Sequence, residues 1–169
     1  TELYENDGWS WYYLAKINLN AGDIKTAKSN ICCASTILSE ELAVLNLYTI
    51  VLKSENRLEE ALKLIESNAK HSGKGSDYRK DAYHLIANFL KDDNQFERAE
   101  SFYEKSLELS PRDELLITDY ADLCVKTEKI SQAENLLARL FMNEPSPKAS
   151  RIMACIATKK GDYYRAELA

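Results

Sequence analysis

Apolar side chains recur at offsets of three and four residues along this chain, with polar side chains between them. In one such segment Leu116, Ile117, Tyr120, Leu123 and Cys124 share one face of a helix. Three prolines and five glycines among 169 residues are fewer turn residues than compact β or mixed folds use. The pattern therefore predicts an all-α chain built from short amphipathic helices.

The helical pattern also repeats at a longer interval. A small residue followed four positions later by a bulky apolar one occurs as Ala27 and Ile31, Ala61 and Ile65, Ala99 and Tyr103, and Ala133 and Leu137, and a fifth unit begins at Ala166. The intervals between these alanines are 34, 38, 34 and 33 residues. The four extra residues of the long interval fall in the loop-like segment 72–76, between two repeats, where an array of repeats tolerates insertions.

The residues inside each unit carry a family resemblance. The first unit has Trp11, Leu14 and Ala15 on its first helix, a Gly22-Asp23 turn, and then Ala27, Ile31 and Ala34 on its second helix. This arrangement resembles the tetratricopeptide repeat, and the resemblance extends over essentially the whole chain. It implies a right-handed superhelical solenoid of antiparallel helix hairpins, with about four and a half repeats in a single solenoid fragment spanning 1–169. The expected repeats are 8–41, 42–78, 79–112, 113–146 and a partial one at 147–169.

Local signals predict where some helices begin and end. Ser146-Pro147 reads as an N-cap followed by the first helical residue. Ser131 and Glu134 have the spacing of a capping box. Gly22 and Gly161 are suited to the left-handed conformation that ends a helix.

Composition bears on the function class. The formal net charge is −5, whereas nucleic-acid binders usually carry a basic balance because phosphate contacts dominate their affinity. No apolar stretch approaches the about 18 residues of a membrane span. The chain opens at Thr1 rather than at a methionine, so the sequence is interpreted as a fragment of a larger protein.

Residues with reactive or metal-binding side chains form no recognisable set. The four cysteines contain no C-x-x-C pair, and the two histidines are too scattered for zinc spacing, so no metal and no cofactor is expected. The cysteines suit small apolar positions in a reducing compartment, which favours a cytoplasmic location. Gly73-Lys74-Gly75-Ser76 lacks the spacing of a phosphate-binding loop. Nothing resembles a catalytic set, so the chain is not expected to be an enzyme.

The family resemblance also implies a binding surface. In tetratricopeptide arrays the first helices line a concave groove in which partner peptides usually bind. Some members clamp a terminal carboxylate there, but the corresponding slots of the last three repeats lack the required set of cations and amides; they hold His84, Asn88, Asp119, Lys148 and Ile152. A mixed groove for a helix or an extended segment is expected instead. Its predicted residues are Tyr12, Lys16, Asn46, Ile50, His84, Asn88, Thr118, Asp122, Arg151 and Cys155.

Three function hypotheses remain open from the sequence. The favoured one is a protein-interaction scaffold that holds a partner peptide or helix in the groove. The alternative is end-to-end self-association, or an intramolecular regulatory module attached to a signalling or transcription-regulating domain, which the aromatic start of the chain motivates. The third is an enzyme or an RNA-binding repeat protein, which the acidic balance disfavours.

Overall fold

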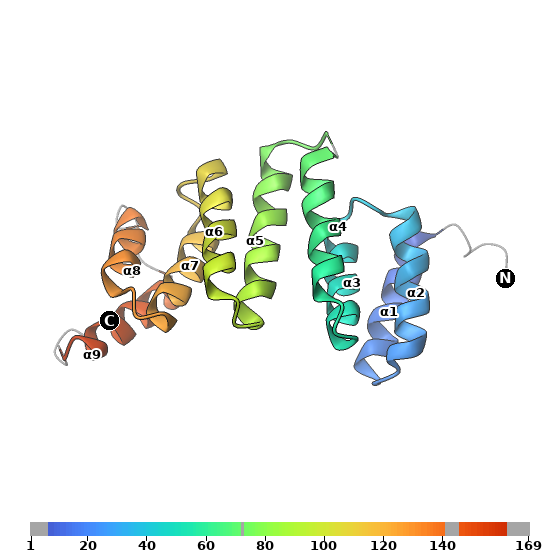
Figure 1. Ribbon diagram of the computed structural model, residues 1–169, viewed down its shortest axis with the longest axis horizontal. Coiled ribbons are helices and arrows are strands. Elements are labelled where there is room, and N and C mark those ends of the chain that lie inside the picture. Colours follow the sequence, from blue (N-terminus) through green and yellow to red (C-terminus); the bar gives the residue numbers. More distant parts are fainter. Residues whose placement is uncertain (1–6, 72, 141–145, 162–169) are drawn as a thin grey trace. The chain divides into compact units, whose positions relative to one another are not determined.

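The computed structural model describes residues 7–71, 73–140 and 146–161, and within these ranges it contains α-helices and no strand. The prediction of an all-α chain is confirmed. The elements in chain order are α1 (Gly8–Asn20), α2 (Ile24–Ile37), α3 (Leu42–Ser54), α4 (Leu58–His71), α5 (Ser76–Asp92), α6 (Phe96–Leu109), α7 (Glu114–Lys126), α8 (Ile130–Leu137) with a 3-10 turn η2 (Ala138–Leu140), and α9 (Pro147–Lys159) (Figure 1). The end of the expected fifth repeat, including Ala166, lies outside the described residues.

The chain divides into two compact units, residues 1–75 and 76–169. Helices α1 to α4 form two antiparallel hairpins in the first unit, and α5 to α9 form two hairpins and a further helix in the second (Figure 1). The division falls inside segment 72–76, which the sequence analysis identified as an insertion. The single continuous solenoid and its right-handed superhelix stay predictions.

The repeated small and bulky residues build the interior of each unit. Ala27, Ala61, Ala99 and Ala133 each expose no more than 1% of their surface, and the bulky residues four positions later are also buried. In the first unit, α2 and α3 share one apolar cluster with α1, formed by Ala15, Ile31, Ala34, Val44, Leu47 and Val51. The packing role predicted for the repeated residues is therefore confirmed.

Two tyrosines join the hairpins of the second unit. Tyr103 of α6 and Tyr120 of α7 stack with ring centroids 5.2 Å apart and planes 10° apart, and both rings are buried. Aromatic pairs in this geometry add roughly 0.5–1.5 kcal/mol beyond the area they bury. The stack therefore anchors α7 on the second helix of the preceding hairpin.

The turn inside each described hairpin, and the turn that follows α9, uses one residue with positive φ. These residues are Gly22, Asn56, Asn94, Glu128 and Gly161, with φ between 58° and 81°, and they follow the intervals of the repeat. The predictions for Gly22 and Gly161 are confirmed. At the two asparagines and the glutamate the same backbone conformation recurs without a glycine.

Aspartate is a frequent N-cap in this chain. The side chains of Asp7, Asp23 and Asp113 accept hydrogen bonds from the backbone at the starts of α1, α2 and α7. Ser146 caps α9 ahead of Pro147, as predicted. The capping box predicted for Ser131 and Glu134 is wrong, because α8 already begins at Ile130 and Ser131 lies within its first turn.

Candidate functional site

In the first unit, the four residues predicted to contact a partner lie on α1 and α3. Tyr12 is partly buried against the apolar cluster, and its ring packs edge-on against the rings of Trp9 and Tyr13. Lys16 and Asn46 are exposed, and Ile50 exposes 41% of its surface. Three of the four side chains are therefore available to a partner.

In the second unit, the six predicted residues have unequal access to solvent. Arg151 and Cys155 on α9 are exposed, and Asp122 on α7 is half-buried. Thr118 exposes 1% of its surface, and its hydroxyl donates to the carbonyl of Leu115 in the same helix. Thr118 therefore offers a partner almost no surface. The remaining two residues, His84 and Asn88 on α5, belong to a polar network.

Asp119 of α7 is the centre of this network. Its carboxylate lies 2.8 Å from Nε2 of His84 on α5 and accepts a 2.6 Å hydrogen bond from Nζ of Lys148 on α9. Nζ of Lys91, also on α5, lies 3.7 Å away. The Asp119 side chain is only 14% exposed, so these groups from three first helices meet at one largely desolvated carboxylate.

The surroundings of Asp119 favour its charged form. Burial opposes ionisation, but hydrogen bonds from His84 and Lys148, with the positive charges of Lys148 and Lys91, outweigh burial and hold the pKa of Asp119 well below its ordinary value. Because an ionised carboxylate can only accept hydrogen bonds, Nε2 of His84 must be the donor in this pair. The arrangement therefore places Nε2–H of His84 against the carboxylate and orients the imidazole ring.

The network extends along the same face. Nζ of Lys91 also lies 3.5 Å from Oδ2 of Asp122. The hydroxyl of Tyr103 donates a 2.6 Å hydrogen bond to the side-chain oxygen of Asn88. Burial raises the pKa of Tyr103, which keeps its hydroxyl protonated as a donor. We name the set His84, Asn88, Lys91, Asp119, Asp122 and Lys148 the α5–α7–α9 network.

Sequence reasoning identified His84, Asn88 and Asp122 but not the centre of the network. The sequence predicted no role for Asp119 or Lys148 beyond showing that the residues of a carboxylate clamp are absent. A usable signal was present: His84 and Asp119 are 35 residues apart, close to one repeat, and Asp119 and Lys148 are 29 apart. Residues about one repeat apart lie on successive first helices, so opposite charges at such intervals can pair.

Within the described ranges, no three His, Cys, Asp or Glu side chains converge in a way that could hold a metal ion. Among the same residues, no helix is both long and apolar enough to cross a bilayer. All four thiols are free, and burial raises the pKa of Cys124 to about 12, which makes that thiol a poor nucleophile.

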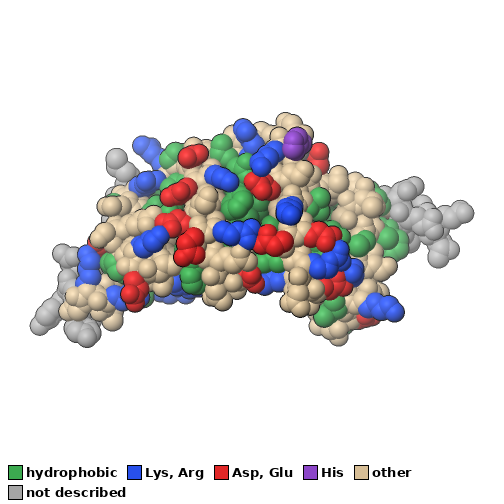
Figure 2. All heavy atoms as spheres, viewed as in Figure 1, with side chains coloured by type: hydrophobic (Ala, Val, Ile, Leu, Met, Phe, Trp, Pro, Cys, Tyr) green, Lys and Arg blue, Asp and Glu red, His purple; other side chains and the backbone are tan. Residues whose placement is uncertain are grey.

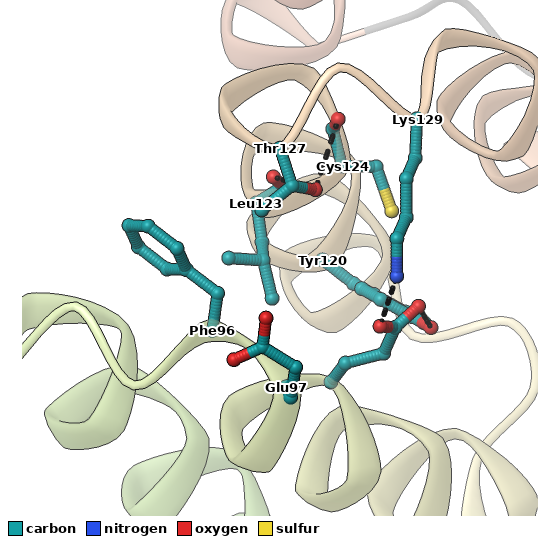
Figure 3. A pocket seen from close by; sticks show the side chains of 8 residues that line it. Phe96, Glu97, Tyr120, Leu123, Cys124, Thr127 and Lys129 are labelled. Carbon is teal, nitrogen blue, oxygen red and sulfur yellow. Dashed lines mark hydrogen bonds and ion pairs between the residues drawn. The ribbon is translucent and has the colours of Figure 1, made fainter.

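A small pocket that Tyr120 helps to line lies between α6 and α7. It measures about 140 Å³ and is lined by Phe96, Glu97, Glu100, Tyr120, Leu123, Cys124, Thr127 and Lys129 (Figure 3). Lys129 forms an ion pair with Glu100, another lining residue. Pockets that hold small-molecule ligands usually measure roughly 300–1,000 Å³. We therefore assign no ligand to this pocket.

Charged side chains are mixed by sign on the surface. Figure 2 shows one face of the molecule, on which Lys and Arg side chains lie interspersed with Asp and Glu and apolar side chains appear between them. A nucleic-acid interface would instead gather basic side chains in a patch or stripe. This face has no such patch.

Comparison with known proteins finds a match to a repeat family within the second unit. Residues 90–156 match the family model described as tetratricopeptide repeat. A curated "TPR repeat-containing protein" of Treponema pallidum (strain Nichols) is 25% identical over 167 residues, which are 98% of this chain. The chain spans about a fifth (21%) of the length of that relative.

Solved structures share the fold at low identity. One, from a functional characterization of Pseudomonas aeruginosa pilF, is 18% identical with a TM-score of 0.70 and covers 99% of this chain and 75% of that chain. Another, YrrB, described as "a TPR protein with an unusual peptide-binding site", is 14% identical with a TM-score of 0.58 and covers 98% and 84% of the two chains. These likenesses show an all-α helical-repeat fold.

Proposed function

Because this chain contains tetratricopeptide repeats, we propose that it is a non-enzymatic scaffold segment that binds a protein partner through the exposed residues of its first helices. Tetratricopeptide repeats generally mediate protein–protein interaction and are typically non-catalytic. The proposal specifies which surface of this chain is used and what kind of segment it accepts.

The observation that supports this surface most directly is the exposure of equivalent positions on α1 and α3. Tyr12 and Asn46 are 34 residues apart, as are Lys16 and Ile50, so they occupy the same two slots of successive repeats. Ile50 is 41% exposed, whereas its neighbours Thr49 and Val51 are buried. The exposed side chains of Ile50, Asn46 and Lys16 would give a partner one apolar and two polar contacts.

The α5–α7–α9 network supports the same role in the second unit. Ion pairs centred on Asp119 hold three first helices in one register and limit the rotamers of His84, Lys91 and Lys148. A pre-ordered surface loses less side-chain entropy on binding, which favours affinity. Asn88, Asp122 and Arg151 are the polar groups that this ordered face offers to a partner.

The mixed chemistry suits an extended peptide or a single helix of the partner. Neither unit's first-helix face is uniformly basic or acidic, so recognition does not rest on charge alone. The peptide-binding site in the description of the structurally similar YrrB supports a peptide as the ligand.

A capture experiment followed by titration tests the proposal. Partners bound by the chain from an extract of the source organism are identified by mass spectrometry, and the purified partner is then titrated against variants. We expect Lys16→Ala, Asn46→Ala and Ile50→Ala together to weaken binding by about tenfold or more, because truncation of contact residues typically costs over 1 kcal/mol at central positions.

The matched control places similar changes on a second helix. Lys63→Ala and Leu64→Ala alter exposed residues of α4 and should leave both the affinity and the melting temperature unchanged. Binding that survives the α1 and α3 substitutions, or that is lost equally in the α4 control, would refute the assignment of this surface.

Two narrower expectations also stay proposals. The four free thiols are compatible with a reducing compartment and hence with a cytoplasmic location, which fractionation of cells would test. The net charge of −5 and the mixed surface argue for protein rather than nucleic acid as the partner.

A further inference from the structure

Helix α1 leaves an unusual number of large apolar side chains at the surface. Trp9 is 40% exposed, Tyr13 57%, Leu14 45% and Ile17 63%. Trp9, Tyr13 and Ile17 follow one another at intervals of four residues and so lie along one stripe of this helix. Single exposed apolar residues are ordinary, but a contiguous group of them marks an interaction surface.

Positions equivalent to Leu14 and Ile17 can be found on the other first helices by adding the repeat interval, and most of them are buried there. Residues 10, 14 and 17 of α1 correspond, 34 residues later, to Val44, Tyr48 and Val51 of α3, where both valines are fully buried. In the second unit they correspond to Leu116, Tyr120 and Leu123 of α7, which expose 0%, 2% and 2%. On α1 the same slots hold Ser10, Leu14 and Ile17, and the last two are exposed.

The buried versions of this stripe are covered by the second helix of the preceding hairpin. Val44 and Val51 share a cluster with Ile31 and Ala34 of α2, and Tyr120 stacks on Tyr103 of α6. The covering helices present a small residue, a bulky one four later and a small one three after that: Ala27, Ile31 and Ala34 on α2, and Ala99, Tyr103 and Ser106 on α6. Among the described residues, α1 has no such helix before it.

We propose that the Leu14 and Ile17 face of α1 is the docking surface for the second helix of one more hairpin, located before α1 in a longer natural polypeptide. The expected occupant is an amphipathic helix with the small–bulky–small spacing of α2 and α6. Twice in this chain the equivalent face is covered in cis across a four-residue connection, between Ile37 and Leu42 and between Leu109 and Glu114. Such a short connection gives a far higher effective concentration than a second molecule has.

The relative from Treponema pallidum is consistent with this occupant, because the region aligned with this chain is 21% of its length. Stacking is also the arrangement that stabilises repeat arrays, since each hairpin buries its apolar face only against a neighbour. The inference does not depend on the proposed partner surface, which lies on other residues of α1 and α3.

Residue-level oxidation by hydroxyl radicals tests the inference without any substitution. Residues 1–169 and the full-length natural polypeptide are oxidised in parallel, and each modified side chain is quantified by mass spectrometry. We expect oxidation of Leu14 and Ile17 to fall by about fivefold or more in the full-length protein, since the equivalent residues of α7 are almost fully buried by a neighbouring hairpin. Leu115, which is 58% exposed on α7, is the internal control and should not change.

A polar variant provides a second readout. Leu14→Gln with Ile17→Gln should leave the urea midpoint of residues 1–169 unchanged, because both side chains are exposed there, but should lower that of the full-length protein. Equal oxidation in the two chains, or a natural polypeptide with no helical hairpin before Thr1, would overturn the proposal. Protection in residues 1–169 alone that grows with concentration would also overturn it, because a second copy would then be the occupant.

Discussion

The residue with positive φ in each hairpin turn decides how well that turn is formed. Glycine adopts this left-handed conformation without strain, and asparagine tolerates it. For a residue with a longer side chain the conformation costs roughly 1–2 kcal/mol of conformational energy. At the fourth turn the chain places Glu128 there, with φ of 61°. Glu128 is exposed, so its side chain is not needed for packing. This turn therefore stores strain that the turns with glycine lack.

Replacing Glu128 by glycine should therefore stabilise the protein. We expect the Glu128→Gly variant to gain about 0.5–1 kcal/mol in the free energy of unfolding, the relieved strain exceeding the entropy that glycine adds to the unfolded chain. Urea unfolding followed by circular dichroism measures it. Asn94→Gly is the matched control and should change stability less, because asparagine already tolerates φ of 58°. A destabilised Glu128→Gly variant would show that the turn is not strained.

The buried carboxylate of Asp119 should make stability depend on acid pH. Its pKa is lowered in the folded state, so its stabilising contribution is complete above the unfolded value of about 3.9 and is lost as pH falls toward the folded pKa. We expect Asp119→Asn to destabilise the protein at pH 7 by about 2–4 kcal/mol, because it removes the negative charge on which Lys91 and Lys148 converge at a largely desolvated site. Below pH 4 the difference in the free energy of unfolding between variant and wild type should shrink.

Asp122→Asn is the control for that measurement. Asp122 is more exposed and its lysine partners lie 3.5 and 3.8 Å away, so its removal should cost less than about 1 kcal/mol. Unfolding curves at several pH values between 2.5 and 7, a range set by these carboxyl groups, measure both variants. A constant difference across this range would mean that Asp119 acts through packing rather than through its charge.

The element scale is where sequence reasoning worked best. The alanine interval predicted both helices of each hairpin, because a helix–helix contact that needs a small residue leaves that residue as a marker in the sequence. The error at Ser131 has a local cause: α8 begins at Ile130, two residues before the start that an N-cap at Ser131 would give, and Lys129 precedes it without a side-chain cap. The Asp119 network was missed because ion pairs between helices leave no fixed residue type; only the interval between opposite charges indicates them.

Helices α1 and α2 approach closely at one end of their hairpin. A Cβ atom added at Gly8, the first residue of α1, would lie 2.6 Å from Cγ of Leu38 and 3.1 Å from Cβ of Ile37, at the end of α2. Both distances are well inside van der Waals contact. The hairpin therefore requires glycine at this position for steric reasons, although alanine is the better helix former.

The Gly8→Ala substitution should consequently destabilise the first unit by about 1–2 kcal/mol, since overpacking outweighs the gain in helix propensity. Gly75→Ala is a suitable control, because a Cβ atom there meets nothing within 4 Å. Thermal unfolding of both variants measures the effect. If Gly8→Ala instead raised the melting temperature, the contact between the start of α1 and the end of α2 would have to be looser than the structure shows.

At the scale of the whole chain, each unit has an interior of its own. The first is built around the cluster containing Ile31 and Val44, and the second around the Tyr103 and Tyr120 stack. The sequence indicated the boundary through four additional residues and two glycines in segment 72–76, but it could not say that two compact units would result. Whether a hairpin array behaves as one body depends on side-chain packing across each junction, which the repeat interval does not encode.

The two tryptophans allow the cooperativity of the units to be measured directly. Trp9 and Trp11 both lie in the first unit, so tryptophan fluorescence reports on its unfolding, while far-ultraviolet circular dichroism reports on both units. Asp119 lies in the second unit. With separate interiors, Asp119→Asn should lower the urea midpoint seen by circular dichroism and leave the fluorescence midpoint within error, because distant sites contribute independently to stability. Gly8→Ala is the matched test in the first unit, and it should lower the urea midpoint seen by tryptophan fluorescence. Equal shifts of both signals in both variants would instead show that the 169 residues unfold as one cooperative array, as nearest-neighbour coupling between all hairpins requires.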